Sequence, residues 1–186
     1  VDDLVAPHPS LYLRPTPLTA ADAGIAALGR ASLAGGADEA SLLELAAAVC
    51  RRIAYRAGVT DVATTAQQAL ALGAGVCQDQ AHVFIAACRA SGWPARYVSG
   101  YFHSPAAPEL ASHAWADVCL DFAARRWLSI DITHLSTMDE RHVRLAVGPD
   151  YAACAPVRGV REGGGDELMS VRVLVDETSD KITLEP

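Results

Sequence analysis

The stretch GVCQDQAHVFIAACRASGWPARYVSGY, residues 75–101, changes from a helical to a strand pattern. Its first half places apolar side chains at helical spacing, at Ala81, Phe84, Ile85 and Cys88. Residues 92–94, Gly-Trp-Pro, end this helix, which begins at about Cys77. From residue 95 the period falls to two, which predicts a strand over 96–102. The stretch therefore predicts a helix that leads directly into a sheet.

Three further helices are expected before this stretch, each opened by a capping box. The first is opened by residues 19–22 and ends near Gly29. The second is opened by residues 41–44 and runs for about four turns, as its apolar spacing indicates. The third is opened by residues 65–68 and stops at Gly73.

Alternating residues predict further strands after the first one, over 112–120, 126–132, 142–147 and 169–175. Helices come first and strands follow, so the predicted fold class is α+β, with no alternation of strand and helix.

Length and proline content predict one folded domain. The chain has 186 residues, close to the roughly 150 of an average domain. Residues 1–18 carry prolines at positions 7, 9, 15 and 17, which disfavour helix, so this part is expected to be an extended leading segment or linker. We expect the domain over 19–176 and a C-terminal tail over 177–186.

Charge and hydropathy exclude several classes of function. The net charge is −7 and the basic residues form no stripe, so neither nucleic acid nor membrane is expected as a partner. The longest purely apolar run, residues 45–50, is far shorter than the about 20 residues of a membrane-spanning helix.

The five cysteines, at positions 50, 77, 88, 119 and 154, include no C-x-x-C pair. This spacing argues against a disulfide framework and against a thiolate zinc site. We therefore expect reduced thiols, a cytoplasmic protein, and neither metal nor cofactor.

Cys77 is placed as a nucleophile would be, in the first turn of the predicted helix. A helix N-terminus carries partial positive charge and free N–H groups, which favour a thiolate and lower the pKa of a thiol. The same N–H groups can donate to the oxyanion of an acyl intermediate. The alternative is that Cys77 is a small buried apolar side chain, as most free cysteines are.

A thiol nucleophile needs a base and an orienting group, and two predicted strands supply candidates. His113 shares a strand face with Trp115, which is expected to lie beside the imidazole and shield it from water. If the next strand forms a hairpin turning near Phe122, Asp131 falls opposite His113 on the same side of the sheet. The alternatives are a surface or core histidine and a turn residue at a strand end.

The chain resembles the bacterial branch of the transglutaminase-like superfamily. The motifs are, in order, GVCQDQAH at 75–82, GWPARYVSGY at 92–101, SHAW at 112–115, WLSIDIT at 127–133, and the late pair VGPDY at 147–151 and PVRG at 156–159. Each motif alone is weak, but their common order and spacing make the resemblance specific.

The resemblance implies a papain-like α+β fold, in which the helix of the nucleophile packs on an antiparallel sheet. It also implies a catalytic triad of Cys77, His113 and Asp131 that transfers acyl groups through a thioester. By the same resemblance, Tyr55 is a candidate donor to the oxyanion. The family usually has an apolar residue in place of Gln80 and a proline in place of Ile132. His134, in place of a small polar residue, is close enough to compete for Asp131.

Three functions remain open. The first is a cysteine peptidase or amidase that hydrolyses amide bonds of a protein or peptide substrate. The second is a transglutaminase that joins a glutamine acyl group to an amine. The third is a binding module on the same fold, since function does not follow from fold.

Overall fold

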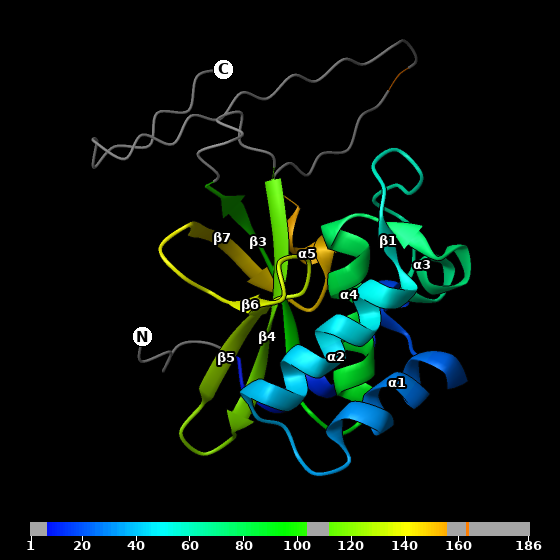
Figure 1. Cartoon of the computed structure of the whole chain (residues 1–186). Coiled ribbons are helices and arrows are strands. Elements are labelled where there is room, and N and C mark those ends of the chain that lie inside the picture. Colours follow the sequence, from blue (N-terminus) through cyan, green and yellow to red (C-terminus); the bar gives the residue numbers. More distant parts are fainter. Residues whose placement is uncertain (1–6, 104–111, 156–162, 164–186) are drawn as a thin grey trace, which may run out of the picture.

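The structure is a computed structural model that describes residues 7–103, 112–155 and 163. Helices gather on one side of a sheet in Figure 1, which confirms the predicted α+β class. The helical elements are η1 (Pro9–Leu13), η2 (Pro17–Thr19), α1 (Ala23–Leu33), α2 (Glu39–Arg52), α3 (Ala66–Leu72), α4 (Cys77–Ala90) and α5 (Tyr151–Cys154).

The main sheet has the strand order β6-β5-β4-β3-β7, and each neighbouring pair is antiparallel. Its strands are β3 (Ala95–Phe102), β4 (Ser112–Asp121), β5 (Arg126–Asp131), β6 (Ser136–Thr137) and β7 (His142–Gly148). Four of them confirm predictions. The two-residue strand β6 and the short parallel pair β1 (Ala54–Tyr55) and β2 (Ala74–Gly75) were not predicted, because two residues show no alternation. The expected strand over 169–175 and the tail over 177–186 lie outside the described residues.

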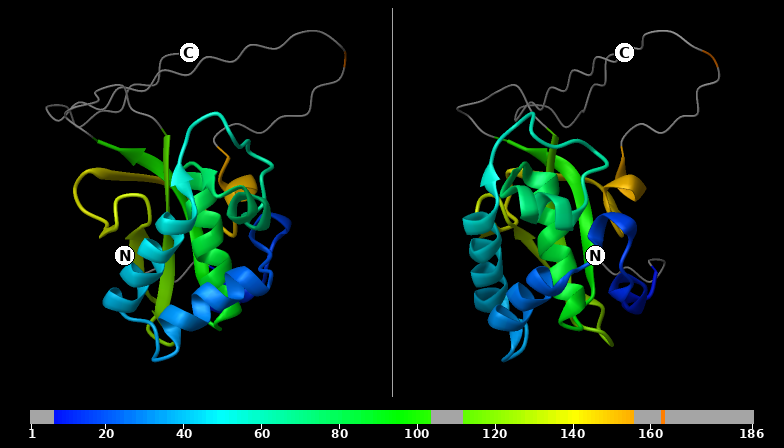
Figure 2. Two further views of the ribbon diagram at one scale, coloured as in Figure 1. Left: turned by 45° about the vertical axis from the view of Figure 1, so that its right-hand side comes forward. Right: turned by 90° about the vertical axis from the view of Figure 1, so that its right-hand side faces the viewer.

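Helix α4 forms the centre of the core. It lies between the sheet and the other helices, as the two views of Figure 2 show. Its side chains Val83, Phe84 and Ile85 are fully buried, and they pack with Ala114, Ala116 and Val118 of β4. Because α4 packs against β3 and β4 of the sheet and against helices α1, α2 and α3, its position relative to the sheet is fixed.

Two of the three predicted capping boxes are displaced. Helix α1 is capped by Asp22, whose carboxylate accepts the Ile25 N–H at 2.8 Å, and α2 begins after Asp38, which accepts the Ser41 N–H at 2.8 Å. In each case a carboxylate provides the cap, three residues after the predicted start in α1 and three residues before it in α2. The third box is confirmed, with Thr65 at the start of α3 and Gly73 in the left-handed conformation at its end.

Residues 7–19 are not extended as expected. They form the 3-10 helices η1 and η2, each with a proline in the first turn, where the missing N–H costs no hydrogen bond. Tyr12 is buried, and its ring meets the edge of Trp127 at 5.6 Å between centroids. Within 7–103, 112–155 and 163, no helix has the length and the hydropathy that a membrane span requires.

Helix α1 continues past Gly29 to Leu33, although its end was predicted at that glycine. A Cβ on Gly29 would overlap the Ala87 carbonyl and the Ser91 hydroxyl of α4. The glycine is therefore required by the close approach of two helices and does not end the helix.

We expect Gly29→Ala to destabilise the fold by roughly 1–3 kcal/mol, because overpacking outweighs the better helix propensity of alanine. The matched control is Gly24→Ala in the same helix, where the added Cβ meets Leu70 at 3.6 Å and the Asp22 cap at 3.3 Å. Thermal unfolding followed by circular dichroism measures both. Equal midpoints for the two variants would contradict the close-approach argument.

Candidate active site

Cys77 is the first residue of α4, as predicted. The turn before it is held by Asp79, whose Oδ2 accepts the Val76 N–H at 2.8 Å and the Thr60 hydroxyl at 2.7 Å. A Cβ on Gly75 would lie 2.5 Å from the same oxygen, so only glycine leaves room for this cap. Asp79 thus fixes the start of the helix that carries the thiol.

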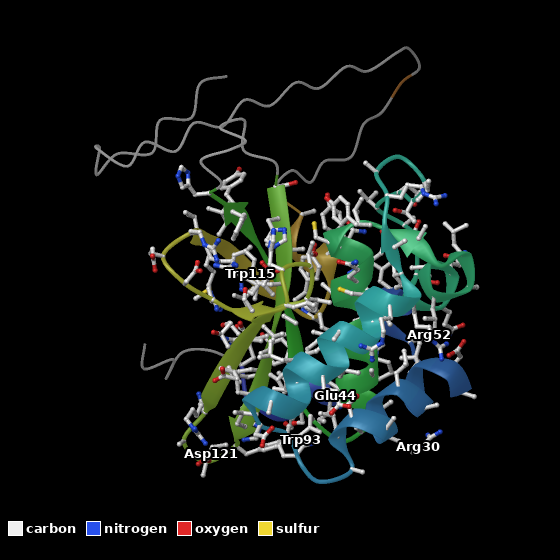
Figure 3. All side chains as sticks on the ribbon, viewed as in Figure 1. Arg30, Glu44, Arg52, Trp93, Trp115 and Asp121 are labelled. Atoms are coloured by element: carbon white, nitrogen blue, oxygen red, sulfur yellow. The ribbon has the colours of Figure 1, made fainter. Side chains whose placement is uncertain are left out.

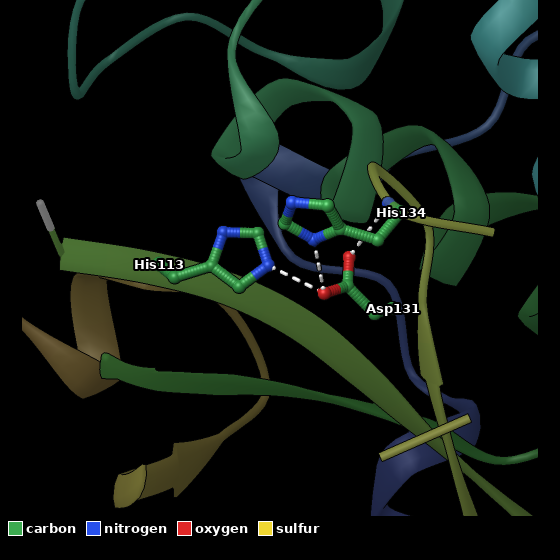
Figure 4. Close-up of side chains that lie close together, drawn as sticks. All are labelled: His113, Asp131 and His134. Carbon is green, nitrogen blue, oxygen red and sulfur yellow. Dashed lines mark hydrogen bonds and ion pairs between the residues drawn. The ribbon is translucent and has the colours of Figure 1, made fainter. Parts of the chain in front are cut away.

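His113 and Asp131 are joined by a hydrogen bond of 2.8 Å between Nε2 and Oδ2. Both residues are buried, with 8% and 1% of their surfaces exposed. The bond occupies Nε2 and leaves Nδ1 without a hydrogen-bond partner among the described residues. Figure 4 shows the bond and the free nitrogen on the other side of the ring.

The register between β4 and β5 differs from the predicted one. Ala116 pairs with Ile130 and Cys119 with Trp127, so Asp131 falls opposite residue 115 and is diagonal to His113. Asp121 pairs with Arg126, so the hairpin turns at residues 122–125 and later than predicted, which shifts the register by three residues, and the β-bulge between residues 119 and 121 takes one residue back. The two side chains still share a face, because the shift is an even number of residues.

Cys77 and His113 line one cavity of about 250 Å³. Its other lining residues are aromatic, small or neutral: Tyr55, Val76, Gln78, Tyr97, Ser99, Ser112, Ala114 and Tyr151. Within the described ranges, no Lys, Arg, Asp or Glu side chain lines it. The cavity is therefore suited to an uncharged group.

The expected lowering of the Cys77 pKa is not found. Burial raises the pKa of this thiol, and the carboxylates of Asp131 and Asp79 act in the same direction. The backbone N–H groups of Ala114 and Gln78 oppose the rise, because they stabilise a thiolate by hydrogen bonding. The helix start therefore does not make the thiol acidic by itself, and a thiolate here needs a positive partner.

Asp131 accepts hydrogen bonds from three imidazoles at one oxygen. Besides His113, its Oδ2 receives His134 Nδ1 at 2.7 Å and His142 Nε2 at 2.9 Å. The backbone N–H of His134 adds a bond of 3.1 Å to Oδ1. We call Asp131 with His113, His134 and His142 the imidazole cluster. The sequence identified His134 as a competitor for Asp131, but it gave no signal for His142, which comes from β7.

The imidazole cluster keeps Asp131 ionised. Burial alone would raise the pKa of this carboxyl, but the hydrogen bonds and charge of His113, with the bonds from His134 and His142, hold it well below its ordinary value. Asp131 is therefore a fixed negative charge beside His113.

Aromatic rings enclose the cluster. Trp115, labelled in Figure 3, is fully buried, and its ring centroid lies 6.0 Å from that of His113 and 5.3 Å from that of His142. Phe102 stacks on His134 at 4.1 Å. Trp115 thus lies beside the imidazole as predicted, but it does not line the cavity.

Tyr55 lies at the mouth of the cavity, with 59% of its surface exposed. Burial of its hydroxyl, and then the charge of Cys77, raise its pKa, so it remains a hydrogen-bond donor.

Gln80, which departs from the family pattern, has a structural role. Its amide donates to the Ile53 carbonyl at 3.0 Å and accepts the Thr133 hydroxyl at 2.8 Å. These bonds tie α4 to the segment after Asp131. Ile132 is fully buried, and its carbonyl accepts the Cys50 thiol at 3.0 Å.

A cysteine at the start of a helix packed on an antiparallel sheet, with a histidine and a carboxylate on neighbouring strands, defines the papain-like α+β class. The family model described as the transglutaminase-like superfamily matches residues 30–132, and the chain belongs to this family.

An uncharacterized protein of Mycobacterium tuberculosis is 37% identical over 128 residues, which cover 64% of this chain and 41% of that protein. An uncharacterized protein of Mycobacterium leprae is 31% identical over 167 residues, which cover 87% and 58%. The chain therefore spans about half the length of these relatives. A crystal structure from Cytophaga hutchinsonii, described as a "putative cysteine protease", has a TM-score of 0.67 and 26% identity and covers 82% of this chain and 50% of that one.

We expect iodoacetamide to alkylate Cys77 faster than the other four thiols near neutral pH. Cys50 is the comparison within the chain, because it is more exposed than Cys77. Partial burial raises the pKa of the Cys50 thiol, and this thiol donates a hydrogen bond to the Ile132 carbonyl. Mass-mapped labelling of wild type and His113→Ala measures the rates. His113→Ala should slow Cys77 and leave Cys50 unchanged, whereas faster labelling of Cys50 in wild type would contradict the nucleophile assignment.

Proposed function

We propose that the protein is a cysteine-dependent acyl hydrolase that cleaves amide bonds through a thioester on Cys77. The observation that carries the proposal is the bond between His113 Nε2 and Asp131, which leaves Nδ1 available on a ring that lines the same cavity as Cys77. In this triad, Cys77 is the nucleophile, His113 the base and Asp131 the orienting group.

The first half of the reaction forms the thioester. Nδ1 of His113 takes the proton from the Cys77 thiol, and the sulfur attacks the carbonyl carbon of the substrate. Asp131 stabilises the imidazolium that forms, because its carboxylate is ionised and hydrogen-bonded to the ring. The imidazolium then gives the proton to the leaving nitrogen, so the amine departs and the thioester remains.

The N–H groups beside the sulfur support the charge that develops on the substrate. Those of Gln78 and Ala114 lie close enough to Cys77 to stabilise a thiolate, so they are placed to donate to an oxyanion as well. Tyr55 is the further candidate donor at the mouth of the cavity. In the second half, His113 takes a proton from water, and the hydroxide released attacks the thioester to give the acid and the free thiol.

The neutral lining of the cavity supports an uncharged acyl group, such as a carboxamide side chain or a peptide carbonyl. Protein or peptide is therefore the proposed substrate class. The crystal structure from Cytophaga hutchinsonii supports hydrolysis as the reaction, because that protein is described as a "putative cysteine protease".

A reducing compartment, the cytoplasm, is the proposed location. All five cysteines are free, four of them buried, and a thiol nucleophile works only when it is reduced.

We expect His113→Ala and Cys77→Ala to lower turnover on an amide substrate by at least about 10³-fold, and Asp131→Asn by roughly 10²–10⁴-fold. The first two remove the base and the nucleophile, and the third removes the charge that orients and stabilises the imidazole. Initial rates of peptide cleavage, with folding checked by circular dichroism, measure the effect.

The matched control is Cys119→Ser, which changes a buried thiol whose hydrogen bond to the Asp121 carbonyl a hydroxyl retains. It should turn over as wild type does. Wild-type rates in any of the three triad variants would make a non-catalytic binding module the better interpretation.

We expect water to be the preferred acceptor of the acyl group over a primary amine. Water is present at about 55 M, so an amine competes only where a site concentrates it. No acidic side chain among the described lining residues is available to hold an ammonium group. A glutamine peptide offered with a labelled amine at millimolar concentration, with both products followed by mass spectrometry, measures the partition. Amine incorporation above deamidation or cleavage would favour the transglutaminase instead.

A further inference from the structure

Two nitrogens and one carboxylate of the imidazole cluster lie close enough to one another to hold one metal ion. One ligand atom each from His113, Asp131 and His134 lies within 4.8 Å of the other two. The two imidazole nitrogens are 2.8 and 2.7 Å from Asp131 Oδ2. Figure 4 shows both rings directed at the carboxylate. Three donors from two strands and the segment after β5 thus converge on one point.

The donor set suits a divalent transition metal. Imidazole nitrogen and carboxylate oxygen are common ligands of Zn²⁺ at about 2.0–2.2 Å, with a fourth position left for water. Ligands of such an ion are about 3.3 Å apart, so each ring must withdraw from the carboxylate by roughly half an ångström. His134 can move, because its side chain is 39% exposed, and this exposed side also gives an ion access to the cluster.

The surroundings already supply the outer hydrogen bonds of a metal site. His142 donates from Nε2 to Asp131, and its side chain is fully buried. Its Nδ1 accepts the backbone N–H of Asp139 at 3.2 Å, which holds the ring in place. A ligating carboxylate is normally oriented by such a bond. When an ion replaces the bonds from His113 and His134, Asp131 keeps this partner.

We propose that His113 Nε2, His134 Nδ1 and the Asp131 carboxylate bind a divalent cation of the zinc class, and that the bound ion inhibits the site. Binding departs from the expectation of no metal, which considered only ligand spacing along the sequence. The binding part does not depend on the proposed function, and the inhibitory part rests on it.

Inhibition follows from the proton on His113. A neutral imidazole that binds an ion through Nε2 carries its proton on Nδ1, so the ring changes tautomer without net loss of a proton. That nitrogen then has no lone pair for the Cys77 proton. The carboxylate that would stabilise an imidazolium is shared with the ion as well. The thiol therefore stays protonated while the ion is bound.

Binding is measured on the full chain with Zn²⁺ against a chromophoric chelator, and with Co²⁺ as a spectroscopic probe. We expect one ion per chain in wild type and in Cys77→Ser, and at least tenfold weaker binding in His134→Ala. The matched control is His8→Ala, which removes an exposed histidine near the N-terminus and should bind as wild type does. Circular dichroism confirms that each variant is folded.

Equal affinity in His134→Ala and wild type would overturn the site. A thiolate-to-cobalt charge-transfer band that disappears in Cys77→Ser would also overturn it, because the ion would then be on the sulfur. For the inhibitory part, Zn²⁺ should slow alkylation of Cys77 in wild type and require at least a tenfold higher concentration in His134→Ala. Site-specific binding without slower alkylation would refute inhibition and leave the binding site standing.

Discussion

The buried carboxylate of Asp131 is the constraint on which the rest of the site depends. A charge with 1% of its residue surface exposed is costly unless hydrogen bonds replace water, and Oδ2 finds three imidazole donors. These donors come from β4, from the segment after β5 and from β7, so satisfying one charge brings three parts of the chain together. The orientation of His113 is a consequence of this arrangement.

The other half of the site is set by helix α4. The helix is buried on all sides, so its first residue cannot shift along the sheet without breaking the core. Asp79 closes the turn before it, and the absence of a Cβ at Gly75 permits that closure. The thiol of Cys77 and the ring of His113 therefore line one cavity because two independent constraints, one apolar and one electrostatic, fix the elements that carry them.

Much of this arrangement was predictable from local patterns in the sequence. The change of period at residue 95 gave the start of β3, and the alternation around His113 gave its shared face with Trp115. The β4–β5 register was wrong by two residues, since an alternating pattern fixes neither the centre of a turn nor the position of a bulge. The N-caps of α1 and α2 are not the predicted residues, because more than one polar side chain near each helix start can accept a hydrogen bond from the first turn.

Two features of the site, the contact of His142 with Asp131 and the pKa of Cys77, could not be predicted because they depend on tertiary structure. His142 lies eleven residues after Asp131, at the start of a strand that β4 and β3 separate from β5 in the sheet, so no local pattern in the sequence indicates that the two side chains meet. Likewise, burial at the helix start could not be read from a motif, and burial reverses the expected direction of the Cys77 pKa. Sequence patterns locate elements, whereas the charge environment of a side chain depends on what packs against it.

This reversal links the two halves of the site. A lone thiolate is unfavourable in a buried cavity beside two carboxylates. A thiolate next to an imidazolium forms an ion pair with no net charge. In the proposed mechanism, Asp131, which stays ionised within the imidazole cluster, stabilises the imidazolium by its charge. In the proposed mechanism, proton transfer from Cys77 to His113 separates no isolated charge: it would convert a neutral pair beside one carboxylate into an ion pair beside the same carboxylate. We therefore propose that the acidity of the thiol is controlled from the sheet, by Asp131, which lies one hydrogen bond beyond the proposed base.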